Sequence, residues 1–194
     1  MQVLEDIIVV DDCINPVYQN ALEDMILKDR TFYWNYYPNL VVKDRYSLAA
    51  GQIQSDAVGF AHVWTQDYKA CSSCAGFMTP LLYEASVKAN IKINKIIQAR
   101  CFMQIPTIKT TEWDGMHVDL VSIPHNVCLY YVNDSDGDTF ISNKRQSNIK
   151  PTEFPIIKRI TPKKGRCVFF NGEHYHSSSK PTQNERAVIN INFN

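Results

Sequence analysis

The sequence predicts an α+β protein in which two early helices precede a series of short strands that form a sandwich or jelly roll. Apolar residues recur at helical spacing over residues 16–29 and again over residues 79–90. Beyond residue 91, the apolar segments become short, contain many β-branched and aromatic residues, and are separated by turn residues. Strands that follow one another without intervening helices favour an antiparallel sandwich or jelly roll over a parallel sheet.

Length and composition predict an ordinary globular chain. The 194 residues are most simply one domain, spanning 1–194, and such a chain is long enough to bury most of its surface. A content of 45% hydrophobic and 11% aromatic residues, with only 7 glycines, argues against disorder. Basic and acidic residues balance at 20 each, so the overall charge predicts no polyanionic partner.

One stretch departs from this charge balance. Residues 143–166 contain eight basic residues and a single acid, Glu153. We favour the interpretation that they form a solvated face, with a surface for an anionic substrate or a nucleic acid as the alternative. The basic residues are Lys144, Arg145, Lys150, Lys158, Arg159, Lys163, Lys164 and Arg166.

The chain shows no targeting or membrane-spanning signal. Its first residues carry no basic segment and no long apolar run, and no later segment has the length of a membrane span. We therefore expect a cytoplasmic protein without a membrane anchor, whose six cysteines are reduced thiols. Cys71 and Cys74 have the C-x-x-C spacing of redox and zinc sites, but no second metal-binding pair lies nearby, so we interpret them as incidental thiols.

The first helix is predicted from its start signals. A β-branched run at residues 7–10 predicts a short buried strand, and Asn15 and Pro16 then supply a helix cap and a first-turn proline. Apolar residues at helical spacing extend the helix over residues 16–29. The aromatic segment 32–37 is typical of a strand, and we favour packing over a binding platform as its role.

The second helix is predicted to begin at Thr79 and Pro80 and to end near Asn90. The segment before it, residues 38–75, follows no clear pattern, and we expect loops with short elements there. His62 lies in this segment without a partner at ligand spacing, so we assign it a structural role. The apolar face of the helix is predicted to consist of Phe77, Leu81, Leu82, Ala85 and Ala89.

The remaining chain is predicted to form strands joined by turns. Pro106 closes the first of these strands, and an Asp-Gly-rich turn at residues 134–138 joins two later strands into a hairpin. The predicted strands cover residues 91–105, 126–133, 139–141, 154–160, 167–170 and 186–193.

A short segment in the middle of the chain carries the residues with the clearest chemistry. If this segment is a strand, alternate side chains share a face, so His117 and Asp119 project together. Two late histidines, His174 and His176, are candidates for a third partner, and Arg186 follows ten residues after the second of them. Two histidines and one carboxylate are the protein ligands of a non-haem iron(II) site.

Such a triad suits oxygen chemistry. It leaves coordination positions open for a bidentate co-substrate and dioxygen, and Arg186 is a natural counter-charge for a co-substrate carboxylate. Each residue alone is weak evidence, but their order and spacing together make coincidence the minority interpretation. Two alternatives stay open, namely a jelly-roll module that only binds a ligand and a cupin-like metal enzyme with a different co-substrate.

Two further segments resemble motifs of the iron(II)- and 2-oxoglutarate-dependent dioxygenase superfamily, close to its prolyl-hydroxylase-like branch and to small oxygenases carried by phages. Residues 129–133 (Leu-Tyr-Tyr-Val-Asn) and residues 136–139 (Asp-Gly-Asp-Thr) resemble the "YLN…GGxT" hairpin of that branch. Residues 161–170 resemble the segment that leads into the family's distal histidine. The N-terminal strand and helix also fit, so the likeness covers most of the chain except residues 38–75.

The resemblance implies a double-stranded β-helix, which is a jelly roll, with supporting N-terminal helices. It implies a hydroxylase that holds Fe(II), consumes 2-oxoglutarate and O2, and releases succinate and CO2. The prime substrate is unidentified and is expected to be a peptidyl residue or a small molecule. The implied iron ligands, which are also the catalytic residues, are His117, Asp119 and His176. The residues implied for the 2-oxoglutarate pocket are Arg186 and Tyr131, which would both contact the distal carboxylate, together with Thr139 and Gln104.

Two neighbouring histidines compete for the third ligand position, and both lie in residues 171–180, where we expect a loop. The spacing to Arg186 favours His176, as do the short polar turn and the proline that follow it, because the family's distal histidine usually precedes such a turn. His174 is then expected to be exposed or to face the substrate. His125 is expected to be a loop residue.

Two positions depart from the family's pattern. Val188 stands where the family often has Ser or Thr, and Asp138 replaces the second glycine of the hairpin. Strand alternation predicts that Val188, Asn190 and Asn192 share the face of Arg186.

Overall fold

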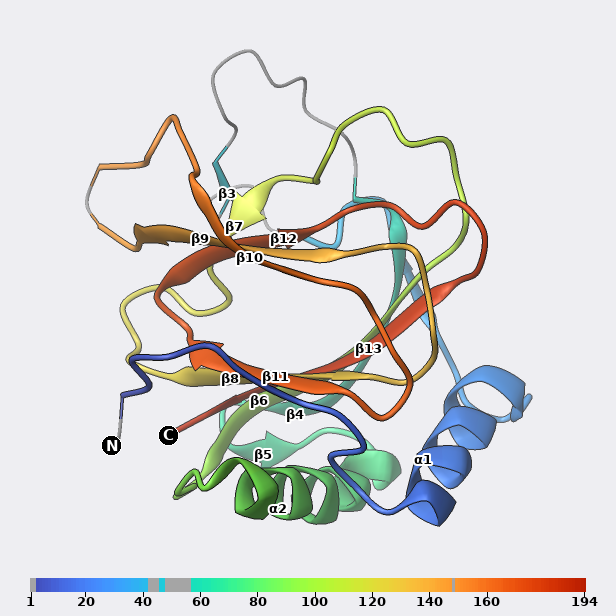
Figure 1. Cartoon of the computed structure of the whole chain (residues 1–194). Helices are drawn as coiled ribbons and strands as arrows, with labels where there is room; N and C mark the ends of the chain where they lie inside the picture. The colour runs from blue at the N-terminus through green and yellow to red at the C-terminus, as the bar shows by residue number, and fades with distance from the viewer. Residues whose placement is uncertain (1–2, 42–45, 48–56, 148) are drawn as a thin grey trace.

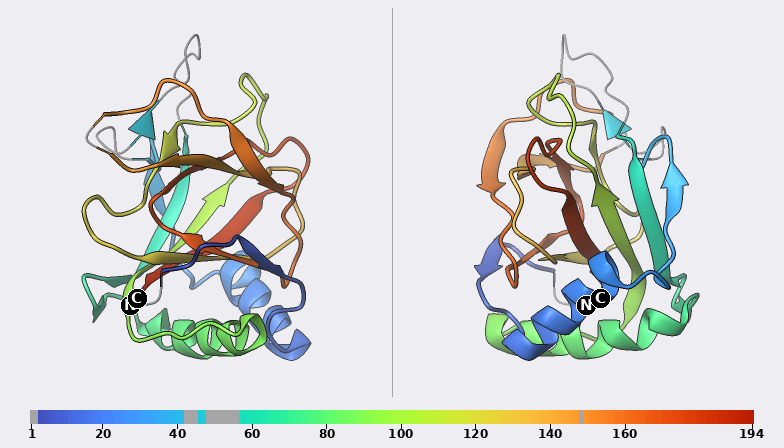
Figure 2. Two further views of the ribbon diagram at one scale, coloured as in Figure 1. Left: turned by 60° about the vertical axis from the view of Figure 1, so that its left-hand side comes forward. Right: turned by 90° about the vertical axis from the view of Figure 1, so that its right-hand side faces the viewer.

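Two antiparallel β-sheets lie face to face, and the helices cover the outer face of the larger sheet (Figure 1, Figure 2). The computed structural model describes residues 3–41, 46–47, 57–147 and 149–194. A sandwich of two antiparallel sheets with early helices is the α+β jelly roll that the sequence predicts, so the expected fold class is confirmed.

The larger sheet has eight strands, and β13 lies at its centre between β8 and β6. Its order is β1 (Ile8–Val10), β11 (Cys167–Asn171), β8 (Asn126–Tyr131), β13 (Arg186–Phe193), β6 (Ile96–Gln104), β4 (Gly59–Gln66) and β2 (Asn35–Tyr37), with β5 (Lys69–Ala70) paired to β4. All neighbours are antiparallel.

The smaller sheet has five strands, and its order brings segments from the middle and the end of the chain together. The order is β10 (Ile156–Ile160), β9 (Thr139–Arg145), β12 (His174–Ser178), β7 (Met116–His117) and β3 (Tyr46–Ser47). All of these neighbours are also antiparallel. The strands that carry the two predicted histidine ligands, β7 and β12, are therefore adjacent.

Helix α1 begins and helix α2 ends at the predicted signals, whereas α2 begins one residue before the predicted Thr79. Helix α1 (Pro16–Glu23) opens at Asn15, whose side chain accepts a hydrogen bond of 2.9 Å from the Val17 amide, and a π-helical turn (Asp24–Lys28) extends it. Helix α2 (Met78–Ala89) follows a 3-10 turn (Ser73–Phe77). It ends at Asn90, whose φ of 55° is the left-handed conformation that closes helices.

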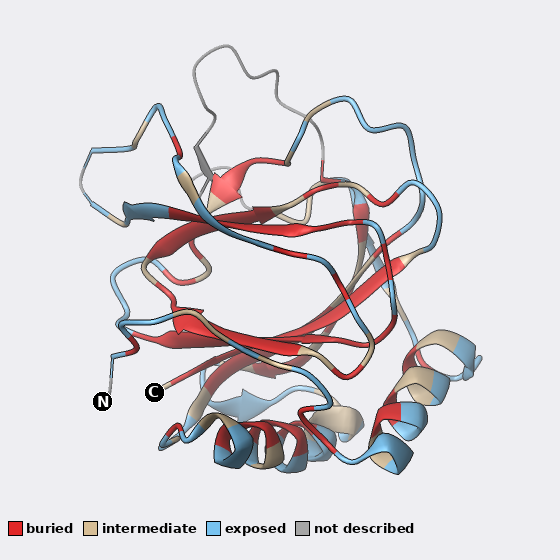
Figure 3. Cartoon of the chain, viewed as in Figure 1, coloured by how far each residue is buried: buried red, intermediate tan, exposed pale blue. Residues whose placement is uncertain are grey.

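Strand β13 separates the apolar core from the interior of the sandwich. All eight of its residues are buried, and alternate side chains point to opposite faces. Ala187, Ile189 and Ile191 join the cluster that packs the sheet against both helices, whereas the intervening residues face the smaller sheet. Figure 3 shows buried residues along both sheets and on the inward faces of the helices. The space between the sheets thus holds a second apolar cluster beside the polar residues that line the cavity.

Three local expectations are wrong. Strand β12 (His174–Ser178) lies within residues 171–180, where a loop is expected, and β4 is a long strand within the segment 38–75, where only short elements are expected. Parts of that segment lie outside the described residues. Phe77 is 41% exposed and precedes α2, whereas its neighbour Met78 is fully buried and takes its place on the apolar face.

The basic stretch 143–166 lies largely on the surface. Lys144 and Lys158 are exposed, as expected for a solvated face. Arg166 is instead tied to the N-terminal segment, because its Nε lies 2.6 Å from Oδ1 of Asp11.

In the aromatic segment, Phe32 is buried against the core while Tyr33 and Tyr36 are exposed.

The cysteines are free thiols, four of them buried. Cys71 is exposed and Cys74 is half-buried. Among the described residues, no helix combines the length and the apolar content that crossing a membrane requires. The cytoplasmic location stays a prediction.

Candidate metal centre

A cavity between the two sheets collects most of the residues predicted for the site. The larger sheet contributes to its wall from β6, β8 and β13, and the smaller sheet from β7, β9 and β12. His117, Asp119 and His176 line this cavity together with Arg186 and Thr139.

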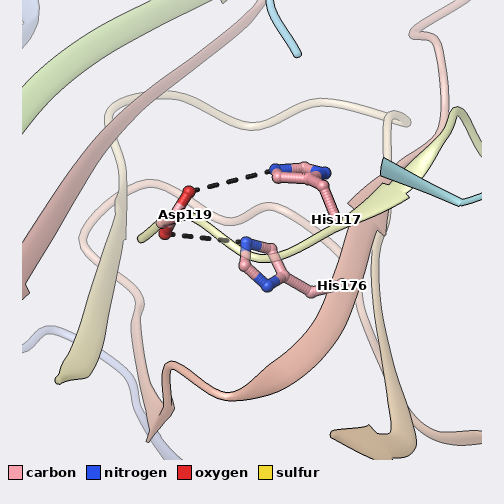
Figure 4. Close-up of side chains that lie close together, drawn as sticks. All are labelled: His117, Asp119 and His176. Carbon is pink, nitrogen blue, oxygen red and sulfur yellow. Dashed lines mark ion pairs between the residues drawn. The ribbon is translucent and has the colours of Figure 1, made fainter. Parts of the chain in front are cut away.

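The two predicted histidine ligands are direct partners across two strands. His117 on β7 pairs with His176 on β12, and their ring centroids are 4.6 Å apart. Asp119 follows the end of β7 and turns back toward both rings (Figure 4). Its Oδ1 lies 3.9 Å from Nε2 of His117, and its Oδ2 lies 3.7 Å from Nε2 of His176. Within the described part of the chain, these residues form the one cluster of three potential metal ligands.

The second nitrogen of each ring fixes its orientation. Nδ1 of His117 lies 3.1 Å from the Gly115 carbonyl, and Nδ1 of His176 lies 3.0 Å from the His174 carbonyl. A carbonyl only accepts hydrogen bonds, so both Nδ1 atoms carry a proton, and in the neutral form of each ring Nε2 presents a lone pair. Nε2 of His176 is buried, and within the described residues no hydrogen-bond partner satisfies it. A buried lone pair beside a carboxylate fits a bound divalent cation.

The charge of the site also suits a cation. Burial alone would raise the pKa of Asp119, but attraction to His176 and, to a smaller extent, His117 outweighs it and holds the pKa well below its usual range. Burial would lower the pKa of His176, and attraction to Asp119 instead raises it. One negative charge and two imidazole nitrogens therefore converge, which is a donor set for a divalent transition metal.

Two amides of the larger sheet hold the carboxylate of Asp119. Nδ2 of Asn190 donates to its Oδ2 at 3.0 Å, and Nδ2 of Asn192 donates to the same oxygen at 2.8 Å. The two asparagines share the inward face of β13 with Arg186, as predicted from strand alternation. Their contact with Asp119 is not predicted.

Arg186 lies in the same cavity and is only 5% exposed. Its Nε donates to the Gly137 carbonyl and its terminal nitrogen donates to Oγ1 of Thr139, both at 2.8 Å. The Tyr131 hydroxyl donates to the same threonine oxygen at 2.8 Å, and burial raises the pKa of Tyr131 to about 12. These hydrogen-bond partners of Arg186 are neutral oxygens, so its positive charge is available to an anion in the cavity.

Gln104 also lines the cavity and is tied to its wall. Its Nε2 donates to Asp114 at 3.3 Å, and its Oε1 accepts from Ser178 at 3.2 Å. Asp114 is 2% exposed and is a charged lining residue that the sequence analysis missed. No local motif marks it, because it lies in the irregular segment between β6 and β7.

Arg100 is a second lining residue that the sequence analysis missed. It lies on β6, and strand alternation gives it the same face as Phe102 and Gln104, which also line the cavity. Its terminal nitrogen donates to Oε1 of Gln66 at 3.2 Å. Alternation along the predicted strand was the available signal, but only the structure shows which face looks inward.

The structure separates the two neighbouring histidines. His174 is 6% exposed, and its Nδ1 lies 2.7 Å from the Ser142 carbonyl, so the expectation of an exposed side chain is wrong. In a regular strand the two rings would share a face, but the pairing of β12 with β9 shifts register between them. Of these two histidines, His176 lines the cavity and His174 does not.

The remaining histidines lie outside the cavity wall. His62 on β4 is buried, contacts the Tyr33 carbonyl and Oγ of Ser72, and so has the expected structural role. His125 lies in the loop before β8 as expected, buried against Gly172.

The fold is similar to that of solved 2-oxoglutarate- and iron-dependent oxygenases. An oxidoreductase of the 2OG-Fe(II) oxygenase family from Burkholderia pseudomallei superposes with a TM-score of 0.67 at 9% identity, over 100% of this chain and 93% of that chain. A prolyl hydroxylase from Trichoplax adhaerens, solved with a peptide fragment of hypoxia inducible factor, gives 0.61 at 13% identity, over 96% and 82%. A non-heme alpha-ketoglutarate-dependent epimerase from nogalamycin biosynthesis gives 0.59 at 11% identity, over 96% and 77%.

Sequence comparison adds nothing to this likeness, because no protein-family model and no curated protein matches the chain. At these identities the likeness concerns the fold, and it confirms the predicted double-stranded β-helix. The resemblance to oxygenases carried by phages stays a prediction.

Proposed function

We propose that this chain is an Fe(II)- and 2-oxoglutarate-dependent oxygenase that hydroxylates a prime substrate with O2 and releases succinate and CO2. The observation that carries the proposal is a single cavity that holds both a cluster of three potential metal ligands and a buried arginine. A metal site alone would suit many enzymes, and a buried guanidinium alone would suit many ligands. Together they match the two ends of 2-oxoglutarate, which chelates a metal at one end and carries a carboxylate at the other.

His117, Asp119 and His176 are proposed to hold the iron. Both rings are tied to backbone carbonyls through Nδ1, so both Nε2 atoms are presented without rearrangement. A bound Fe(II) ion supplies the oxygen chemistry, which side chains alone do not provide. The chain itself keeps water away, because the ligands lie within the sandwich and are largely buried.

Arg186 is proposed to bind the distal carboxylate of 2-oxoglutarate. Its described hydrogen bonds use two of its five N–H donors, and the others remain for a carboxylate. Thr139 accepts from both Arg186 and Tyr131, so its own hydroxyl proton is available to the same carboxylate. Tyr131 then acts through Thr139, whereas the resemblance implies direct contact. Gln104 is proposed to shape the adjoining wall.

The prime substrate is proposed to be a peptidyl residue or a small molecule. Among the similar structures, one holds a peptide fragment and another is an epimerase, so the fold serves more than one substrate and reaction. Hydroxylation is the outcome that we propose here. A nucleic acid is not favoured, because among the described residues none of the basic stretch 143–166 lines the cavity.

Anaerobic titration tests the proposal directly. Adding Fe(II) and then 2-oxoglutarate to the protein is expected to produce a weak visible charge-transfer band that saturates at one equivalent. Admitting O2 is expected to convert 2-oxoglutarate to succinate, slowly without prime substrate and faster when a peptide or small-molecule library contains it. Metal binding without the band or succinate would contradict the proposal and favour a binding module or a metal enzyme with another co-substrate.

Gly137 supplies a more local test of the Arg186 pocket. A Cβ atom at this position would lie 2.8 Å from Cδ of Arg186 and 3.0 Å from the Ser179 carbonyl. Gly137→Ala is therefore expected to displace the guanidinium and to weaken 2-oxoglutarate binding by on the order of 10-fold to 100-fold. Titration of the Mn(II)-loaded protein measures the dissociation constant. Gly76→Ala is the matched control, because nothing lies within 4 Å of its added Cβ, and it should leave the constant unchanged.

A further inference from the structure

Two buried amides on the central strand of the larger sheet face the proposed metal site from the opposite side. Asn190 is 9% exposed and Asn192 is 2% exposed, on a strand whose other inward residues include Val188. Burying a primary amide without hydrogen bonds is costly. Both amides are therefore expected to have hydrogen-bond partners.

Those partners form one short network. Each asparagine donates through Nδ2 to Oδ2 of Asp119, at 3.0 Å from Asn190 and 2.8 Å from Asn192. Nδ2 of Asn192 also donates to Oδ1 of Asn190 at 3.4 Å, so Asn192 also helps to orient the amide of Asn190. A carboxylate only accepts hydrogen bonds, which fixes the orientation of both amides.

The carboxylate needs this support because its own backbone does not supply it. Strand β7 ends at His117, and Asp119 lies beyond its last residue. The side chain is thus held across the sandwich by the larger sheet, while the imidazoles of His117 and His176 stand on the smaller sheet. Both amide donors act on the same oxygen, Oδ2.

We propose that Asn190 and Asn192 are positioning residues that hold Asp119 for the metal. They hold the carboxylate against rotation, so that the site is preorganised before the ion arrives. Asn190 lines the cavity and Asn192 lies behind it. The inference rests on the proposed metal site but not on any particular co-substrate or reaction.

Metal affinity tests this assignment without relying on turnover. Calorimetric titration of the metal-free protein with Mn(II) is expected to give dissociation constants that are about 10-fold to 100-fold weaker in Asn190→Ala and in Asn192→Ala than in the wild type. Asn171→Ala is the matched control, since Asn171 is also a buried amide of the larger sheet but accepts from the Glu173 amide instead. It should bind Mn(II) as the wild type does.

The serine variants extend the test. Asn190→Ser and Asn192→Ser keep a donor in a smaller side chain, so they are expected to recover part of the affinity and to replace any alanine variant that does not fold. Circular dichroism confirms the fold before each titration. Folded alanine or serine variants with wild-type affinity, or an equal loss in Asn171→Ala, would overturn the assignment.

The outcomes also separate this inference from the proposed function. Weaker Mn(II) binding in the asparagine variants, with no 2-oxoglutarate consumption by the iron-loaded wild type, supports the positioning role and overturns the oxygenase. Normal 2-oxoglutarate consumption by the iron-loaded wild type, with unchanged Mn(II) affinity in the asparagine variants, supports the oxygenase and overturns the positioning role. A wild type that binds no Mn(II) overturns both.

Discussion

His176→Ala is expected to abolish tight metal binding, whereas His174→Ala is expected to preserve it. The first change removes a buried Nε2 that faces Asp119, and the second removes a ring that bonds to the Ser142 carbonyl outside the cavity wall. Loss of a supporting outer group already weakens metal binding by roughly 10-fold to 100-fold, so loss of a ligand should exceed the upper end of that range. Calorimetric titration with Mn(II) and the iron charge-transfer band both report the effect.

The pair of variants is informative because both residues are buried on one strand. His174→Ala is expected to lower thermal stability through the lost hydrogen bond while the Mn(II) dissociation constant stays close to that of the wild type. If metal binding instead survives in His176→Ala and disappears in His174→Ala, the assignment of the third ligand is reversed. Asp119→Ala and His117→Ala should match His176→Ala.

Arg186→Leu is expected to leave Mn(II) binding intact and to weaken 2-oxoglutarate binding severely. Truncating one partner of a buried charge pair costs about 2–5 kcal/mol, which corresponds to about 30-fold or more in the dissociation constant. The proposed partner is the distal carboxylate, so a 2-oxo acid without that carboxylate should bind the variant and the wild type equally. Anaerobic titration of the metal-loaded protein with each acid measures both constants.

An exposed arginine provides the control for this charge change. Arg145→Leu removes one positive charge from β9 on the surface and should leave 2-oxoglutarate binding unchanged. Arg186→Lys keeps the charge without the planar guanidinium and should bind 2-oxoglutarate with intermediate affinity. Unchanged affinity in Arg186→Leu would favour a metal enzyme with a different co-substrate.

The parts of the site that the sequence predicts depend on short-range spacing. His117 and Asp119 are two residues apart, and Arg186 follows His176 by ten residues. The fold class follows from similar local information, namely helical spacing early in the chain and short strand patterns later. These relations need no knowledge of which strands become neighbours.

The parts that the sequence does not predict depend on contacts between distant residues. Asn190 and Asn192 contact Asp119 across separations of 71 and 73 positions, and strand alternation says only that they share a face. Strand β12 has a polar sequence and is a strand because β9 and β7 pair with it on both sides. The register shift within β12 decides which histidine faces inward, and no residue type marks it in advance.

The placement of the three ligands also means that a bound metal ion would affect the stability of the fold. Both imidazoles lie on the smaller sheet, whereas the amides that hold the Asp119 carboxylate lie on the larger sheet. A bound ion would therefore link the two sheets. An ion that binds only this closed form stabilises it in proportion to its occupancy. Withdrawing the ion would remove this contribution to the stability of the closed form.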